Sequence, residues 1–310
     1  MKKLFIISLM SVLIATNLFA QTPAPVDTSW KKGGLGALNF NQVSFTNWAA
    51  GGENSISGAA FLSLFANYAK DKMSWDNQLD LAYGLTKIGD TKIRKNEDKI
   101  DFNSKVGYKI DDSKFYYTFL FNFKSQFAEG FTKPEDSIPV SKFAAPAYLL
   151  YSLGIDYKPN ERFSVYLSPI TGKTLIVTDQ NIADAGIYGN DPLTIDANGN
   201  ITHGKKTFTQ VGAYLRATYK KDIMTNVNLQ TKLELFSNYL KNPQNIAVNW
   251  EVLFAMKINK FLTANLGTQM IYDDIISVPI VKKVNGVNVT TLHKRVQFKE
   301  VFGLGLSYKF

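Results

Sequence analysis

A regular alternation of short and long connections is the feature that most constrains the fold of this sequence. Between the connections, apolar and polar residues alternate with period two, as expected for β-strands, for example in "FYYTFLFNF" (115–123). Twelve such segments lie at 34–46, 54–69, 72–85, 97–110, 113–127, 146–157, 161–171, 207–219, 223–236, 244–258, 260–273 and 293–310. Short polar turns lie at 70–72, 111–113, 158–161, 220–222 and 259–260, and longer links lie at 47–53, 86–96, 128–145, 172–206, 237–243 and 274–292.

This alternation predicts an all-β fold, an antiparallel transmembrane β-barrel of about 12 strands. Outer-membrane barrels have short periplasmic turns and long outer loops, and we expect the same arrangement here. A tilted strand needs about 9–11 residues to cross a membrane, and most of these segments are longer. The alternative is a secreted β-sandwich with two sheets packed face to face. The two ends of a sandwich are equivalent, so that fold gives no reason for the alternation.

The aromatic residues support the barrel. They make up 13% of the chain. Many of them stand at the apolar positions of the alternation in their strand, which we call the apolar parity, and lie close to a short turn or to the C-terminus. These are Tyr68, Trp75, Tyr108, Tyr117, Tyr157, Phe163, Tyr219 and Tyr308. Aromatic side chains at one end of the strands are typical of the girdle at a membrane interface.

The N-terminal twenty residues read as a cleaved signal peptide. Lys2 and Lys3 precede the apolar run "LFIISLMSVLIA" (4–15), and a small residue, Ala20, ends the segment. We therefore expect a signal peptide at 1–20, a periplasmic segment at 21–33 and the barrel at 34–310, in the cell outer membrane. The expected partners are outer-membrane lipid and the barrel-insertion machinery, which would read the C-terminal strand ending in Phe310; no nucleic acid is expected.

Charged residues at the polar positions of the alternation, which we call the polar parity, should face the lumen. Four are acidic and four are basic: Asp80, Asp101, Lys105, Lys124, Arg216, Lys232, Glu234 and Glu251. Such a mixed interior does not indicate strong ion selectivity. Two readings stay open, because twelve strands lie between the filled eight-stranded barrels and the open barrels of 16–18 strands. The lumen is either occluded by ion pairs or a narrow pore for small polar solutes.

The sequence gives little support for catalysis. The chain has no cysteine and only two histidines, His203 and His293, both beside predicted outer loops and without a motif that fixes a nucleophile. We expect no catalytic residues, no metal and no cofactor, and the chain is not predicted to be an enzyme. The 172–206 link is the longest and would act as a lid or a plug. The "NG" within 281–292 predicts a hairpin above the membrane.

The first predicted hairpin carries the motif "NWAAGGENS" (47–55). A phosphate-binding loop would join a strand to a helix, whereas this motif joins two strands. Its glycines, Gly51 and Gly52, would allow a tight reversal and Trp48 would anchor at the interface, while Asn47, Glu53 and Asn54 would bond the turn backbone. If the motif folds inward instead and pins the first strand pair, Trp48→Ala should lower heat stability or insertion without changing solute flux.

The stretch "LNFNQVSFTNWAAGGENSISG" (38–58) resembles an uncharacterised family, domain of unknown function 3078. The resemblance implies a Bacteroidetes-type outer-membrane barrel and no established activity. Three roles therefore follow as hypotheses. The chain is a structural barrel or narrow passive pore, an accessory component of an outer-membrane assembly or secretion machine, or a membrane-embedded hydrolase.

Overall fold

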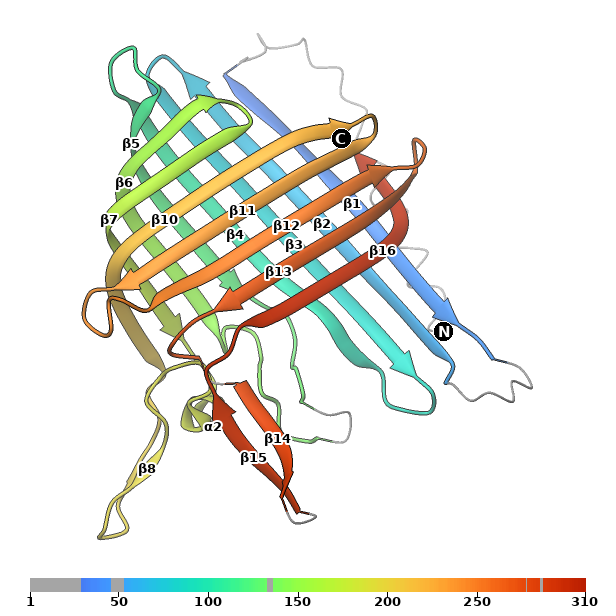
Figure 1. Cartoon of the computed structure of the whole chain (residues 1–310), viewed down its shortest axis with the longest axis vertical. Coiled ribbons are helices and arrows are strands. Elements are labelled where there is room, and N and C mark those ends of the chain that lie inside the picture. The colour runs from blue at the N-terminus through green and yellow to red at the C-terminus, as the bar shows by residue number, and fades with distance from the viewer. Residues whose placement is uncertain (1–28, 46–52, 133–135, 277, 285–286) are drawn as a thin grey trace, which may run out of the picture.

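Twelve long antiparallel strands close into one barrel (Figure 1). The computed structural model describes residues 29–45, 53–132, 136–276, 278–284 and 287–310 of the 310-residue chain. The barrel strands are β1 (Trp30–Val43), β2 (Ser55–Lys70), β3 (Met73–Ile88), β4 (Arg94–Lys109), β5 (Phe115–Ser125), β6 (Ala147–Asn160), β7 (Phe163–Ile176), β10 (Thr207–Met224), β11 (Val227–Asn238), β12 (Ile246–Lys257), β13 (Leu262–Tyr272) and β16 (Gln297–Lys309). The predicted antiparallel barrel and its strand number are confirmed.

Each barrel strand pairs with the next one along the chain, and β1 pairs with β16 to close the barrel. The closing register runs from Leu35↔Lys309 to Asn39↔Gly305. It continues in two backbone hydrogen bonds, from Gly34 N to Phe310 O at 2.9 Å and from Phe310 N to Gly34 O at 3.1 Å. The C-terminal residue is therefore part of the barrel wall.

The first strand starts earlier than the sequence predicted. It begins at Trp30 rather than at residue 34, because Trp30 pairs with Tyr68 and its ring packs against other aromatic rings. The centroid of the Trp30 ring lies 5.2 Å from that of Tyr68 and 5.8 Å from that of Trp75. Aromatic pairs at such distances are favourable. They extend β1 to the short-turn end of the barrel.

The outer face of the barrel is apolar. Large side chains of the apolar parity are exposed on all sides of it, for example Leu38 (62%), Leu153 (58%) and Phe302 (61%). The lumen-facing positions, by contrast, contain most of the buried polar residues, such as Asp101 and Asp156. This is the inverse of a soluble barrel, whose outer face is polar.

The short connections are tight turns whose residues tolerate the required backbone. Asp71, Asp111 and Asn226 each have a positive φ, at 53°, 46° and 65°. Among residues with a Cβ, Asp and Asn adopt this conformation most readily, because their short polar side chains can hydrogen-bond locally. These turns join β2 to β3, β4 to β5 and β10 to β11, all at one end of the barrel (Figure 1).

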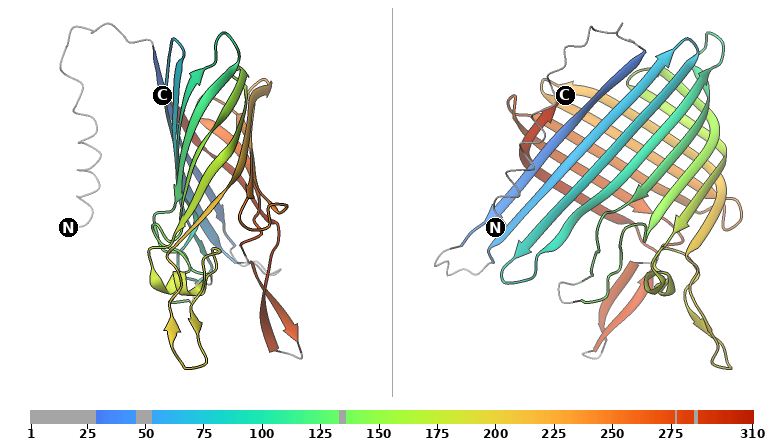
Figure 2. Two further views of the ribbon diagram at one scale, coloured as in Figure 1. Left: turned by 90° about the vertical axis from the view of Figure 1, so that its left-hand side faces the viewer. Right: turned by 180° about the vertical axis from the view of Figure 1, so that it is seen from behind.

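The long links lie at the opposite end. The link between β7 and β10 contains α2 (Gln180–Ala185), β8 (Thr194–Ile195) and β9 (Ile201–Thr202). A separate hairpin, β14 (Val278–Val284) and β15 (Val287–His293), extends away from the barrel as predicted (Figure 2). No helix among the described residues is long and apolar enough to cross a membrane.

The β7–β10 link, 177–206, starts later than expected because β7 continues to Ile176. It docks on the barrel rim: Ile182 and Ala183 of α2 are buried against Leu175 and Val177, and Asp179 caps the helix by accepting a hydrogen bond from Ile182 N at 3.1 Å. Because α2 lies at the end of the barrel and not inside it (Figures 1 and 2), the link covers part of the rim and does not plug the lumen.

Candidate functional site

The barrel is flattened, much narrower in the left view of Figure 2 than in Figure 1. Charged side chains from its opposite walls lie within ion-pair distance of one another, as in Lys99–Glu251 and Lys124–Glu234. We call six of them the central network: Lys99, Asp101, Lys124, Lys232, Glu234 and Glu251. They come from β4, β5, β11 and β12. Strands β4 and β12 are diametrically opposite, with five strands between them in either direction.

Glu234 is the most heavily bonded member of the central network. It accepts hydrogen bonds from Lys124 Nζ at 3.0 Å, from Tyr214 Oη at 2.6 Å and from Asn249 Nδ2 at 2.7 Å. Lys124 lies on β5, and three strands separate β5 from β11, the strand of Glu234. The Lys124–Glu234 ion pair therefore crosses the lumen.

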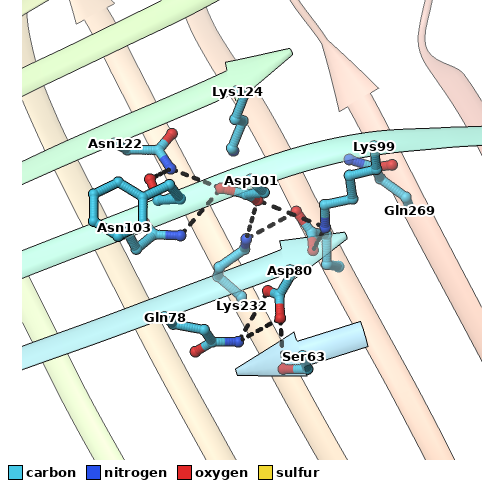
Figure 3. Close-up of polar contacts among 12 residues, drawn as sticks. Ser63, Gln78, Asp80, Lys99, Asp101, Asn103, Asn122, Lys124, Lys232 and Gln269 are labelled. Carbon is cyan, nitrogen blue, oxygen red and sulfur yellow. Dashed lines mark hydrogen bonds and ion pairs between the residues drawn. The ribbon is translucent and has the colours of Figure 1, made fainter. Parts of the chain in front are cut away.

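Asp101 has a buried carboxylate with two different environments (Figure 3). Its Oδ1 accepts hydrogen bonds from Asn122 Nδ2 at 2.7 Å and from Asn103 Nδ2 at 3.1 Å. Its Oδ2 has no hydrogen-bond partner, and the nearest cations are Lys99 Nζ at 3.6 Å and Lys232 Nζ at 3.9 Å. The carboxylate is thus held by charge on one side and by two amides on the other.

A second set of charges lies nearer the short turns. Lys105 Nζ donates to Asp156 Oδ2 at 2.7 Å, and Lys158 Nζ donates to Asp76 Oδ2 at 2.7 Å. Asp156 is fully buried and also accepts a hydrogen bond from Ser164 Oγ at 2.6 Å. This set links lumen-facing side chains of β3, β4 and β6, which lie within four consecutive strands of the barrel wall.

Four large side chains fill the lumen beside these networks. Leu120, Tyr166, Tyr214 and Phe236 are 0%, 1%, 3% and 6% exposed and form one cluster. The expectation that the interior is lined by polar residues is incomplete here. A barrel whose walls approach this closely needs bulky groups to exclude voids, and these aliphatic and aromatic side chains supply that volume.

The eight predicted lumen charges do not all meet. Five of them, together with Lys99, form the central network: Asp101, Lys124, Lys232, Glu234 and Glu251. Lys105 instead pairs with Asp156 in the second set. Arg216 Nη1 donates to Asn103 Oδ1 across the lumen at 2.7 Å. Asp80 is hydrogen-bonded to neutral side chains instead: it accepts from Ser63 Oγ at 2.6 Å and from Gln78 Nε2 at 2.9 and 3.0 Å.

Sequence reasoning missed Lys99, Asp156 and Lys158 as lumen charges. Asp156 lies close to the predicted short turn at 158–161, Lys158 lies inside it, and Lys99 lies close to a predicted strand start. None of the three is a mid-strand residue in the predicted segments. The signal that could have found Lys99 and Asp156 is parity. Lys99 shares the parity of Asp101, and Asp156 pairs with Tyr116 and Tyr166 on the lumen side of their strands.

A cavity of about 200 Å³ opens above the central network, on the side of the long links. Opposite walls line it, with Glu97, Asp98, Lys99, Ile100 and Asp101 from β4, Lys124 and Ser125 from β5, Glu251 from β12, Gln269 from β13 and Lys299 from β16. At the wall, Lys299 Nζ donates to both carboxylate oxygens of Glu97, at 2.7 and 2.9 Å. The central network is the floor of this cavity.

The motif residues of the first hairpin are described only in part, because Asn47, Trp48, Gly51 and Gly52 lie outside the described residues. Asn54 Oδ1 accepts a hydrogen bond from Phe45 N at 2.6 Å, and Asn54 O accepts one from Gly89 N at 2.7 Å. A Cβ on Gly89, whose φ is 54°, would lie 3.3 Å from Glu53 Oε2. Glu53 and Asn54 thus contact the link between β3 and β4.

The two histidines are far apart in sequence, and each lies beside a polar side chain. His203 Nδ1 lies 2.9 Å from Asp184 Oδ2, and His293 Nε2 lies 2.9 Å from Thr291 Oγ1. Hydrogen bonds from Gln180 and from His203 hold the pKa of Asp184 below its usual range. In the described part of the chain, no group of three or more His, Cys, Asp or Glu side chains is arranged to hold a metal ion.

Comparison with solved structures places the chain beside other barrels at low similarity. An outer membrane channel from Pseudomonas putida F1 is 14% identical, with a TM-score of 0.38; the alignment covers 93% of this chain and 99% of that one. An active-site mutant of outer membrane phospholipase A from Escherichia coli is 10% identical, with a TM-score of 0.33 and coverage of 93% and 94%. At such values the likeness carries no argument about activity.

No curated protein matches the chain. One family model does, described as a protein of unknown function (DUF3078), over residues 40–131. This region runs from the end of β1 to just past β5 and includes the "NWAAGGENS" motif. The predicted resemblance to this uncharacterised family is therefore confirmed over residues 40–131, less than a third of the chain.

Proposed function

We propose that the chain is an outer-membrane β-barrel protein whose lumen is closed at mid-height, and that it serves as a structural barrel without passive flux. The apolar outer face supports the membrane location. Exposed patches of this extent are rare on soluble monomers, and lipid would cover them. The aromatic groups at the short-turn end, such as Trp30, Tyr68 and Trp75, would lie at the periplasmic interface.

The single observation that carries the closed lumen is the wall-to-wall central network. To pass, a hydrated ion would have to separate pairs such as Lys124–Glu234, whose atoms are 3.0 Å apart. Leaving one partner of a buried pair uncompensated costs several kcal/mol, about 3–5. The buried cluster around Leu120 and Tyr166 supports the same closure, because its side chains occupy lumen volume beside the network.

Planar-bilayer recording of the purified protein tests the closed barrel. We expect the wild type to be silent, and a variant in which Lys124 and Glu234 are both replaced by Ala to conduct, because two bridging side chains are removed. The Lys205→Ala variant is the control, since Lys205 pairs with Asp191 on an exposed link. A steady conductance of the wild type at low voltage would refute the closed barrel.

A narrow pore for small polar solutes is the second candidate, favoured by the cavity of about 200 Å³ above the network. In that case the network would be a gate that opens transiently. Swelling of protein-loaded liposomes in small sugars or amino acids distinguishes the two: swelling above the rate of empty liposomes supports the pore. An unchanged rate supports the structural barrel.

A hydrolase is the weaker alternative. The His203–Asp184 pair has the geometry of a base and its orienting acid, but no hydroxyl group is hydrogen-bonded to the other ring nitrogen of His203 among the described residues. We therefore propose no enzymatic activity. Lipid hydrolysis that disappears in both His203→Ala and His293→Ala variants, with the barrel still folded, would contradict this.

A further inference from the structure

The cavity above the central network contains charged groups that the protein leaves partly unsatisfied. Asp101 is 0% exposed, and its Oδ2 accepts no hydrogen bond. Lys99 Nζ lies 3.6 Å from this oxygen and 4.0 Å from Glu251 Oε2, beyond hydrogen-bond length in both cases. The other oxygen of Glu251, Oε1, is already bonded to Lys232 Nζ at 3.0 Å.

The remaining charges of the cavity wall have close partners. Lys299 bonds Glu97, and Asp98 accepts hydrogen bonds from Lys95 Nζ at 2.8 Å and from two backbone N–H groups. Lys124 bonds Glu234 at 3.0 Å. The unused hydrogen-bonding capacity of the cavity wall is therefore concentrated at one place, where a carboxylate oxygen of Asp101 and the ammonium of Lys99 lie side by side (Figure 3).

Buried polar groups without partners are costly, so a molecule that supplies both a donor and an acceptor would gain binding free energy here. The cavity wall carries four carboxylates, of Glu97, Asp98, Asp101 and Glu251, and three ammonium groups, of Lys99, Lys124 and Lys299. Their near balance gives no attraction for a ligand of one sign. A zwitterion brings both charges and leaves this balance unchanged.

The geometry also limits the ligand's length. The two spare groups are 3.6 Å apart, so a ligand that bonds both must carry its own positive and negative groups at a similar separation. An α-amino acid meets this condition, because its ammonium and carboxylate flank a single carbon. The cavity has a volume of about 200 Å³. Pockets for drug-sized ligands have volumes of about 300–1,000 Å³, so the molecule must also be small.

We propose that this cavity is a binding site for small α-amino-acid-like zwitterions. The ligand ammonium donates to Asp101 Oδ2 and to Glu251 Oε2, and the ligand carboxylate accepts from Lys99 Nζ. This site goes beyond the closed structural barrel, because it gives the barrel a ligand that enters from the long-link end. The binding site requires the barrel fold, but it does not depend on whether the lumen conducts ions.

Isothermal titration of the full chain, refolded in detergent micelles, tests the site with glycine as the probe. Methylammonium and acetate each present one half of glycine, and ε-aminocaproate carries the same two charges far apart. We expect saturable binding of glycine, and binding at least tenfold weaker for the other three. Absence of saturable glycine binding would mean that only water fills the cavity. Equal binding of any of the other three would mean that the paired-charge geometry is wrong; either result overturns the proposal.

Two variants locate the site. Asp101→Asn and Lys99→Gln should each weaken glycine binding at least tenfold, while Lys31→Gln, at the short-turn end and paired only with exposed Glu161, should leave it unchanged. If Asp101→Asn fails to fold, Lys99→Gln still decides, since the Lys99 side chain is 38% exposed and its ion pairs are long, at 3.6 Å to Asp101 and 4.0 Å to Glu251. Unchanged binding in folded Lys99→Gln would overturn the proposal. These titrations do not depend on the bilayer recordings, so the two proposals can fail separately.

Discussion

The replacement Glu234→Ala tests whether the central network holds the barrel together. The Glu234 side chain is 10% exposed and the Lys124 side chain 29%. The substitution leaves Lys124 without its closest carboxylate and the buried hydroxyl of Tyr214 without its acceptor, which lies at 2.6 Å. Asn249 Nδ2 also loses its acceptor at 2.7 Å but keeps its longer hydrogen bond to Glu251 Oε1, at 3.3 Å.

The magnitude follows from burial. Removing one partner of a buried ion pair costs about 3–5 kcal/mol, and an unsatisfied buried hydroxyl about 1–3 kcal/mol. These losses overlap at one site, and Lys124 keeps some contact with solvent, so we expect about 3–5 kcal/mol in total. With a urea dependence of about 2 kcal/mol per M, the midpoint of unfolding should fall by about 2 M.

Urea unfolding in detergent micelles, followed by tryptophan fluorescence, measures the effect. The decisive comparison is the double variant Lys124→Leu with Glu234→Leu. Replacing both members of a buried pair by apolar residues is often close to neutral, so the double variant should be more stable than Glu234→Ala. Lys205→Ala, which removes an exposed pair with Asp191, should cost about 0–1 kcal/mol. If Glu234→Ala costs no more than this control, or the double variant is the least stable, the ion-pair reasoning is wrong.

Three further predictions concern the seam, the outer face and the rim. The chain has no cysteine, so Leu38→Cys with Leu306→Cys, which pair across the closing strands, should form a disulfide that alters mobility on non-reducing gels; no shift would argue against closure. Phe119→Arg, near the centre of β5 and 43% exposed, should destabilise the barrel by about 2–4 kcal/mol in lipid vesicles, and a neutral effect would contradict lipid contact. The hydrogen bond from Lys142 holds the pKa of Asp179 below its usual range. The Asp179 carboxylate therefore stabilises the docked 177–206 link above the ordinary carboxyl pKa of about 3.9, and this stabilisation is lost as pH falls through the lower pKa of the folded state. Pepsin cleavage within the link should rise as pH falls through this range in the wild type, and should not rise in Asp179→Asn.

Most of the fold could be predicted because the barrel repeats one local rule. Alternation with period two identifies strands, and the connection lengths assign their ends, so neither step needs a long-range contact. The strand boundaries were less predictable. Trp30 extends β1 by packing on Tyr68 and Trp75, which lie in other strands. The residues next to Trp30 in the sequence do not predict this contact.

The site was predictable by residue type but not by partner. Parity places Lys124 and Glu234 on the same face of their strands, yet 110 positions separate them along the chain. Their contact depends on the flattened cross-section, which no local pattern encodes. The same limit explains the lumen cluster. Leu120 and Phe236 have the polar parity of their strands, and only the closeness of the opposite wall makes an apolar residue suitable there.

The central network also explains how a barrel with apolar residues on both faces keeps its register. A slip of one residue exchanges the two faces of a strand. For β11, which carries Leu233 and Leu235 outward and Phe236 inward, apolar side chains alone penalise such a slip weakly. The slip would, however, turn Lys232 and Glu234 into lipid, where a charge near the mid-plane costs about 2–4 kcal/mol, and would break the bonds to Lys124 and Asn249. Charges that close the lumen therefore also fix which face of the strand is inside. A barrel with this interior would lose register specificity if the network were replaced by apolar residues, even where its stability did not fall.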